Sequence, residues 1–202
     1  MKVRWQNQYD KKSPPWDYDK FDPDFQKFFK DQDCSNKITE NCKIIDLGCG
    51  TGSQVYHIKS LGFDVIGTDI LNVLEYDINF IIDDALDSKL SSKYEIIIDR
   101  GLIHNLFHLE NKDNYFRMMN DITHDESYIV LKTMSPYEPR FHPAINSQTG
   151  PYRFNEGQLI ELFEVIDFEC IEIKDTFFHS NSVIPHLRGY FCIYTKRRKD
   201  HH

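Results

Sequence analysis

The sequence predicts an α/β protein with a seven-stranded, mostly parallel sheet, helices on both faces and a C-terminal antiparallel strand pair. Short apolar runs alternate with helical patterns, which is typical of strands joined by crossover helices. The last two β-rich runs have no helical pattern between them, so an antiparallel pair is expected there. A length of 202 residues suits one sizeable core, and a content of 40% hydrophobic residues excludes collagen-like and wholly disordered chains.

Five apolar runs predict the parallel part of the sheet. Several of them are apolar throughout, as strands covered by helices on both faces require. Two further β-rich runs follow one more helical pattern near the end of the chain. In chain order the seven predicted strands span residues 43–46, 64–69, 79–82, 94–99, 127–132, 168–174 and 189–196.

A helix with one aromatic face is predicted ahead of the sheet. Asp22 is suited to the N-cap and Pro23 to the first turn of this helix. The aromatic face allows two interpretations, packing against the sheet or a wall of a substrate site. Its members are Phe21, Phe25, Phe28 and Phe29.

Two later helices carry their own start or stop signals. The helix over residues 53–61 ends at Gly62, a residue suited to a left-handed stop. Asn155 and Gln158 have the spacing of a capping box at the start of another helix. Between these elements, residues 133–154 form a long proline-containing stretch, which we interpret as a wall of the active site.

Charge and cysteine content exclude several classes of partner and site. The formal net charge of −8 makes nucleic acid a poor partner. No apolar run could cross a bilayer and the N-terminus lacks the apolar middle of a signal peptide, so a cytoplasmic protein without a membrane partner is expected. The five cysteines form no CxxC pair, which predicts reduced thiols and no metal site.

A glycine-rich turn is the strongest functional signal. An apolar strand runs into Gly48, Gly50 and Gly52 and then into a helix, a position where glycine allows a ligand to approach the backbone. In a parallel sheet such a turn lies at the carboxyl ends of the strands, where ligands bind. Asp69 ends the next strand about 20 residues after Gly48, the spacing of an acidic residue that binds ribose hydroxyls. The ligand is therefore expected to contain a ribose.

Four segments together resemble the motifs of class I S-adenosylmethionine-dependent methyltransferases, which have a Rossmann-like sheet. They are DLGCGTG at 46–52, GTD at 67–69, DDA at 83–85 and DRGL at 99–102. The resemblance implies that the glycine loop cradles the methionine portion, that Asp69 binds the ribose and that Asp84 with Ala85 reads the adenine edge. It assigns to the cofactor Asp46, Gly48, Cys49, Gly50, Gly52, Asp69, Ile70, Asp84, Ala85, Asp99, Arg100 and Trp16.

The flanking segments resemble a narrower group. SPPWD at 13–17, DRGLIH at 99–104 and GPYRF at 150–154 are similar to the bacterial small-molecule branch related to thiopurine and tellurite-resistance methyltransferases. In that branch the N-terminal segment covers the cofactor, which implies that Trp16 stacks near the sulfonium. One departure is the short connection of residues 70–77, where the family has a fuller helix.

The same resemblance divides the chain into two parts. Residues 1–39 are expected to form an N-terminal helical cover segment, and residues 40–198 an S-adenosylmethionine-binding methyltransferase domain. Aromatic residues such as Trp5 and Tyr9 favour a mobile cover over the site. Trp16 is interpreted either as part of this cover or as packing.

Methyl transfer from a sulfonium needs alignment and exclusion of water more than a nucleophilic side chain. His104 and Asp99 are the candidate catalytic residues, because Asp99 ends the strand at 94–99 and His104 lies five residues after it. As a base for a thiol or phenol, His104 is expected to titrate near its ordinary value of ~6.5; a structural histidine is the alternative. Tyr152, Arg153 and His142 are candidates for orienting the acceptor.

These observations predict transfer of a methyl group from S-adenosyl-L-methionine to a sulfur, oxygen or nitrogen of a small molecule. The alternatives are a protein methyltransferase, which needs an open groove, a non-catalytic S-adenosylmethionine-binding module, and an NAD dehydrogenase. Methylation of nucleic-acid amines is disfavoured, because Asp99-Arg100-Gly101-Leu102 replaces the Asn/Asp-Pro-Pro-Tyr pattern of that chemistry. A monomer or a homodimer is expected.

Overall fold

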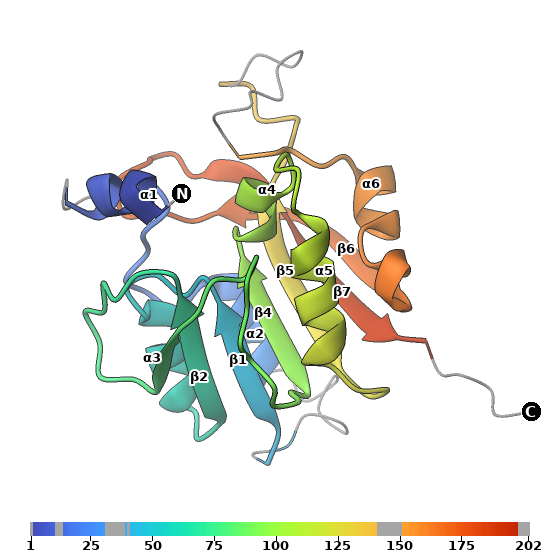
Figure 1. Ribbon diagram of the computed structural model, residues 1–202. Coiled ribbons are helices and arrows are strands. Elements are labelled where there is room, and N and C mark those ends of the chain that lie inside the picture. The colour runs from blue at the N-terminus through green and yellow to red at the C-terminus, as the bar shows by residue number, and fades with distance from the viewer. Residues whose placement is uncertain (1, 11–13, 31–38, 40, 141–150, 198–202) are drawn as a thin grey trace, which may run out of the picture.

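A computed structural model describes residues 2–10, 14–30, 39, 41–140 and 151–197. Its seven strands form one sheet in the order β3-β2-β1-β4-β5-β7-β6 (Figure 1). The first five are parallel, and β7 lies antiparallel between β5 and β6. The predicted fold class and all seven predicted strands are confirmed. The strands are β1 (Lys43–Leu47), β2 (Asp64–Asp69), β3 (Phe80–Ile82), β4 (Ile96–Arg100), β5 (Tyr128–Met134), β6 (Phe168–Phe178) and β7 (Leu187–Lys196).

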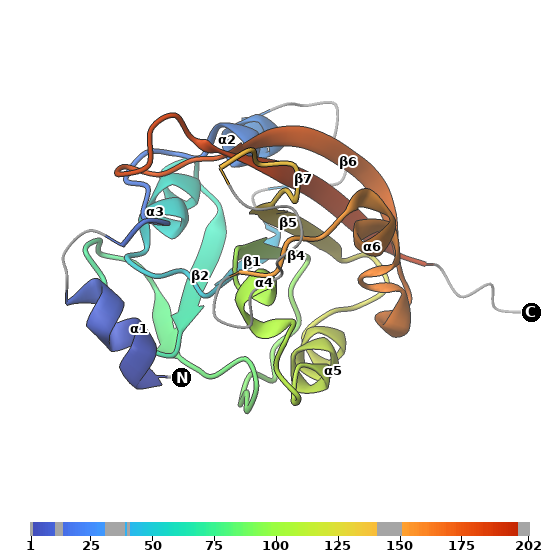
Figure 2. The same ribbon diagram turned by 90° about the horizontal axis from the view of Figure 1, so that it is seen from above.

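Helices cover both faces of this sheet (Figure 2). One face is covered by α2 and α3, and the other by α4, α5 and α6. The first helix, α1, instead lies beyond the carboxyl ends of the strands, at the upper left of Figure 1. The bounds are α1 (Lys2–Tyr9), α2 (Pro23–Lys30), α3 (Ser53–Lys59), α4 (Ile103–Leu106), α5 (Asp113–Asp121), α6 (Glu156–Glu161) and a 3-10 turn at Glu164–Ile166.

The aromatic face of α2 is part of the core. Phe25, Phe28 and Phe29 are buried and pack with apolar residues of α3 and of the central strands. The packing interpretation of this face is therefore the correct one, and α2 belongs physically to the sheet. Its start is as predicted, because Pro23 is the first helical residue and Asp22 accepts a hydrogen bond from the Asp24 N–H at 3.2 Å.

A buried cluster of ion pairs and hydrogen bonds holds α2 against the sheet. Lys132, in the middle of β5, is completely buried and contacts the carboxylates of both Asp22 and Asp24. Asp24 also accepts from Lys174 at 2.9 Å and from the Thr176 hydroxyl at 2.5 Å. Hydrogen bonds and opposite charges of this kind are what a fully buried ammonium group requires.

The other helix signals also have the predicted geometry. Gly62, after α3, has a φ of +96°. At α6, Asn155 and Gln158 form both hydrogen bonds of a capping box, at 2.9 and 3.0 Å. Residues 70–77 contain no helix, so the connection from β2 to β3 is an extended loop. Among the described residues, no helix combines the length and apolar character needed to cross a membrane.

Candidate active site

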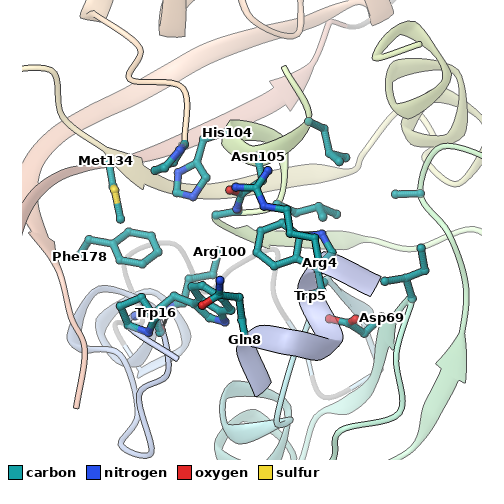
Figure 3. Close-up of a pocket in the computed structure, with 18 of the residues that line it drawn as sticks. Arg4, Trp5, Gln8, Trp16, Asp69, Arg100, His104, Asn105, Met134 and Phe178 are labelled. Atoms are coloured by element: carbon teal, nitrogen blue, oxygen red, sulfur yellow. Dashed lines mark hydrogen bonds between the residues drawn. The ribbon is translucent and has the colours of Figure 1, made fainter. Parts of the chain in front are cut away.

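A cavity of about 620 Å³ lies at the carboxyl ends of β1, β2 and β4, with α1 across it. Figure 3 shows Asp69 at one end of this cavity, and Met134 and Phe178 at the other. The volume falls in the usual range of ~300–1,000 Å³ for small-molecule sites. The residues assigned to the cofactor that line it are Gly48, Asp69, Ile70, Asp84, Ala85, Arg100 and Trp16.

A second hollow of about 50 Å³ lies beside the first and shares Gly48, Trp16 and Arg100 with it. It brings in three more of the assigned residues, namely Asp46, Cys49 and Gly50. The last two assigned residues, Gly52 and Asp99, line neither hollow.

The glycine loop, residues 48–52, lies at the edge of the cavity, where Gly48 and Gly50 have no side chains. Gly50 has a φ of +56°, and a Cβ there would lie 2.6 Å from the Tyr9 hydroxyl. A side chain at this position would therefore meet α1 and strain the backbone. Gly52 has a packing role instead, because its Cβ would lie 2.7 Å from Cδ1 of Ile78.

Asp69 joins the end of β2 to the glycine loop. Its carboxylate accepts the N–H of Gly50 and the N–H of Leu71, each at 3.0 Å. Burial nevertheless raises the pKa of Asp69 above its ordinary value. The carboxylate is thus fixed in orientation and faces the cavity, as a ribose-binding residue requires.

The loop after β3 supplies a second set of polar groups. Asp83, Asp84 and Ala85 all line the cavity, and Asp84 accepts the Leu86 N–H at 3.0 Å. Strand order places this loop next to Asp69, because β3 pairs with β2. The structure therefore brings the predicted ribose and adenine residues together at one end of the cavity.

Cys49 fills space within the loop. A Cβ on Gly67 would lie 2.7 Å from the Sγ of Cys49, so the thiol packs in the space that this glycine leaves. Burial raises the pKa of the Cys49 thiol, which keeps it protonated and unreactive. Cys42, Cys170 and Cys192 likewise form no disulfide within the described residues.

Asp99 lies behind the cavity wall rather than in it. Its carboxylate is fully buried and accepts the N–H groups of Leu102 and Ile103, at 2.6 and 2.8 Å, and the Tyr115 hydroxyl at 2.7 Å. Burial raises its pKa to about 6. These bonds fix the turn between β4 and α4, so Asp99 positions the residues that follow it.

His104, from α4, lines the cavity opposite the aromatic ring of Phe178. Its Nδ1 lies 3.0 Å from Oγ1 of Thr133 on β5. Burial, with the Arg100 charge nearby, lowers the pKa of His104 to about 3. The expected titration near ~6.5 is therefore wrong for this environment, and the imidazole is neutral across the physiological range.

Arg100 connects three parts of the site. Its Nε donates to Asp22 at 3.1 Å, its Nη1 to the Trp16 carbonyl at 2.9 Å and its Nη2 to the His179 carbonyl at 2.5 Å. The guanidinium carbon also lies 4.5 Å from the ring centre of Phe178. Arg100 thus holds the N-terminal segment and the loop after β6 on the same side of the cavity.

Aromatic residues of the N-terminal segment cover the cavity. Trp5 and Tyr9 lie four residues apart on one face of α1, and both line it together with Arg4 and Gln8. The ring of Trp16 meets Trp5 edge to face at 5.3 Å, and its Nε1 donates to the Tyr9 hydroxyl at 3.3 Å. The aromatic residues are recognisable in the sequence, whereas Arg4 and Gln8 are not, because a polar face on a short helix is usually solvated.

The end of the cavity away from Asp69 is mainly apolar. Met134, Phe178, Val183 and Leu187 line it, and Arg140 lies at its edge. The Arg140 guanidinium is already bound, to Glu138 at 2.5 Å and to two backbone carbonyls of the loop before β7. This compartment therefore favours a planar or apolar group over a highly charged one.

The long stretch before α6 contributes less than predicted. Met134, Arg140 and Pro151 line the cavity, but Tyr152 and Arg153 do not. Tyr152 packs against aromatic residues of the α4 side, and its N–H donates to the His104 carbonyl at 2.6 Å. Its role is thus to support α4. His142 lies outside the described residues.

Comparisons with known proteins agree with this geometry. A family model described as a methyltransferase domain matches residues 16–173, more than half of the chain. No curated protein matches the sequence.

Three solved structures illustrate the likeness. The one reported for conversion of a disulfide bond into a thioacetal group during echinomycin biosynthesis has a TM-score of 0.70 and 17% identity, over 92% of this chain and 86% of that one. The Burkholderia thailandensis 1,6-didemethyltoxoflavin-N1-methyltransferase, with bound 1,6-didemethyltoxoflavin and S-adenosylhomocysteine, has a TM-score of 0.64 and 13% identity. The match covers 83% of this chain and 75% of that one. A TehB-like methyltransferase from Corynebacterium glutamicum has a TM-score of 0.56 and 16% identity, over 81% of this chain and 85% of that one. At these identities the likeness establishes the fold.

Proposed function

The chain belongs to the S-adenosylmethionine-dependent methyltransferases, and we propose that it methylates a sulfur, oxygen or nitrogen atom of a small molecule. The observation that carries this proposal is one continuous cavity with two different ends. Asp69 and Asp84 lie at the polar end, and Met134 and Phe178 lie at the apolar end. A polar nucleoside and an apolar acceptor would meet between them.

The residues present fit the cofactor. Gly48 and Gly50 present no side chain to the two hollows, Asp69 is fixed by two N–H groups, and Asp84 with Ala85 follows β3. When bound, S-adenosylmethionine supplies a sulfonium methyl group that is already activated for attack by a nucleophile. What remains for the chain is to align the acceptor and to exclude water, which can contribute ~7 kcal/mol or more.

The enclosure of the cavity supports a small acceptor over a protein substrate. Trp5, Tyr9 and Trp16 line the cavity and contact one another, so together they cover part of it, and an extended polypeptide would have to displace them. Removing water from the apolar end would also strengthen the interaction between the acceptor and its polar partners. The bound small molecule of the Burkholderia thailandensis enzyme is consistent with this choice.

Calorimetry with S-adenosylhomocysteine tests the cofactor assignment. Gly50→Val and Asp69→Ala should each weaken binding by ~10-fold or more, because one fills the glycine loop and the other removes a charged hydrogen-bond partner. Asp87→Ala is the matched control, since the Asp87 side chain is exposed and pairs with the equally exposed Lys89. Wild-type affinity in both cavity variants would contradict the assignment.

Transfer of label then separates an enzyme from a binding module. Wild-type protein is incubated with methyl-labelled S-adenosylmethionine and pools of small thiols, phenols and amines. Label in a small molecule supports the proposal, and label in added protein supports the protein methyltransferase. Binding without transfer to any pool supports the non-catalytic alternative.

A further inference from the structure

His104 and Thr133 form a buried polar pair at the acceptor end of the cavity. The two residues come from α4 and β5, and Oγ1 of Thr133 lies 3.0 Å from Nδ1 of His104. Thr133 has no exposed surface, and His104 is 3% exposed. Buried polar groups of this kind are expected to have all their hydrogens bonded.

The threonine hydroxyl decides which atom of the pair donates. A hydroxyl has one hydrogen to donate, and within the described part of the chain Nδ1 of His104 is the one atom that can receive it from Thr133. If Nδ1 carried a hydrogen instead, the hydroxyl would accept and its own hydrogen would have no acceptor. That arrangement would cost ~1–3 kcal/mol. Donation from Thr133 to Nδ1 is therefore favoured.

Acceptance at Nδ1 places the ring hydrogen of a neutral imidazole on Nε2. Burial and the Arg100 charge keep the ring neutral, as the pKa of about 3 indicates. Nε2 lies over Gly101, where a Cβ would approach to within 2.9 Å, and both residues line the cavity. Figure 3 shows the ring beside Met134 and Phe178. The Nε2–H bond is thus available to a molecule at the acceptor end.

We propose that Thr133 fixes His104 as the Nε2–H tautomer, and that His104 binds the methyl acceptor as a hydrogen-bond donor rather than deprotonating it. This inference rests on the proposed function. The matching acceptor presents a lone pair or a negative charge to Nε2–H while its flat or apolar body contacts Met134 and Phe178. Thr133 is then a positioning residue for His104.

The transfer step balances without a base. A lone pair of the acceptor that is not bound to Nε2–H forms the bond to the methyl carbon, so in an amine acceptor another atom accepts from Nε2–H. The bond from the methyl carbon to sulfur breaks, and its electrons remain on sulfur as a neutral thioether. A thiol or phenol would lose its proton to water before this step, and an amine after it. His104 neither gains nor loses a proton.

Nitrogen NMR tests the tautomer without any turnover. In ¹⁵N-histidine-labelled protein the two ring nitrogens of His104, assigned with His104→Gln, distinguish protonation at Nε2 from protonation at Nδ1. Wild type and Thr133→Ser should show Nε2–H, because serine keeps the hydroxyl, whereas Thr133→Val should lose this preference. A wild-type ring that carries its hydrogen on Nδ1, or that protonates between pH 5 and 8, overturns the proposal.

Transfer assays test the role of the donor. His104→Gln can still donate and should retain most of the rate, whereas His104→Leu should raise the KM and lower the rate by ~10-fold or more. Asp99, with a pKa of about 6, and Asp46, with a pKa of about 8, also titrate near the site, so the pH profile of wild type is compared with that of His104→Gln, and the two should have the same shape. A break in the wild-type profile that His104→Gln removes would show a base and overturn the proposal. Failure of wild type to bind S-adenosylhomocysteine would refute the proposed function alone, because the NMR result does not depend on it.

Discussion

Asp22 and Arg100 are 78 positions apart in the sequence, yet Oδ2 of one lies 3.1 Å from Nε of the other in a nearly buried ion pair. Because Arg100 also binds the carbonyls of Trp16 and His179, Asp22 orients a guanidinium that supports the cavity wall. Asp22 itself does not line the cavity. Asp22 precedes α2, and two positions later, within α2, Asp24 contacts lysines but not Arg100.

This difference predicts distinct effects of Asp22→Asn and Asp24→Asn. Each variant removes a buried carboxylate beside Lys132, so each should lower the free energy of unfolding, by ~3–5 kcal/mol. Asp22→Asn alone releases Arg100 and should change the tryptophan emission, since both tryptophans of the chain, Trp5 and Trp16, line the cavity. Urea unfolding and fluorescence spectra measure the two effects.

An emission change of the same size in both variants would show that the cluster acts only through general stability. If Asp22→Asn fails to fold, Arg100→Lys gives the same comparison, because lysine keeps the charge but cannot reach all three partners. Its spectrum should then differ from wild type while Asp24→Asn remains similar to wild type.

Truncation should separate the two helices of the predicted cover segment. Removing residues 1–10 takes away α1, which has no buried residue, so the protein should fold with its unfolding midpoint nearly unchanged. Removing residues 1–30 takes away Phe25, Phe28 and Phe29 of the core and should abolish folding. Thermal unfolding checks both results. A large loss of stability on removing residues 1–10 would show that α1 is structural rather than a cover.

Most of the fold could be predicted because each strand has its own run of apolar residues in the sequence. Runs such as 43–46 and 94–99 are mainly apolar and end in Asp46 and Asp99, close to the edge of the sheet where the cavity lies. The main difference is β6, which was predicted to end at residue 174 and ends at Phe178. Its last residues are held by pairing with β7, in which Phe178 lies opposite Leu187. Such pairing depends on another part of the chain.

The cofactor end of the site was also predictable, whereas its supports were not. Gly48, Asp69 and Asp84 each follow a strand, so sequence position alone brings them to one edge of the sheet. Lys132 and Thr133 lie within β5 and give no local signal, because a polar residue in a strand usually faces solvent. Their partners are on α2 and α4, and only the packing of the whole chain shows them.

Asp46 should make stability depend on pH. Burial, with Asp99 and Asp69 nearby, raises its pKa from 3.8 to about 8, so the folded protein keeps a proton that the unfolded chain has lost. This contribution to stability is present at low pH and is lost as the pH rises through about 8. Asp46→Asn resembles the protonated form and removes the dependence. Relative to wild type, the variant should gain up to ~1.4 kcal/mol in free energy of unfolding for each pH unit between 3.8 and about 8, and nothing further above about 8.

Urea unfolding of both proteins at several pH values measures this difference. Asp87→Asn serves as the control, because its carboxylate is exposed. A constant difference between wild type and Asp46→Asn across the range would mean that Asp46 is ionised in the folded protein.

Tyr9 should bind the amino-acid end of the cofactor through its hydroxyl. The oxygen lies over Gly50 of the loop expected to hold the methionine portion, and it accepts the Nε1–H of Trp16. Among the described residues no acceptor receives its hydrogen, and burial beside Asp69 raises the pKa of Tyr9, so the hydroxyl stays protonated. It can therefore donate to the cofactor carboxylate.

Tyr9→Phe removes this donor and little else. A hydrogen bond to a charged group contributes ~1.5–3 kcal/mol, so the affinity for S-adenosylhomocysteine should fall ~10-fold or more. The affinity for 5′-methylthioadenosine, which lacks the amino acid, should be unchanged. Tyr137→Phe, at an exposed tyrosine outside the cavity, is the matched control in the same calorimetric titrations. Equal losses for both ligands would place Tyr9 against the nucleoside instead, and unchanged binding of both would show that its hydroxyl does not contact the ligand.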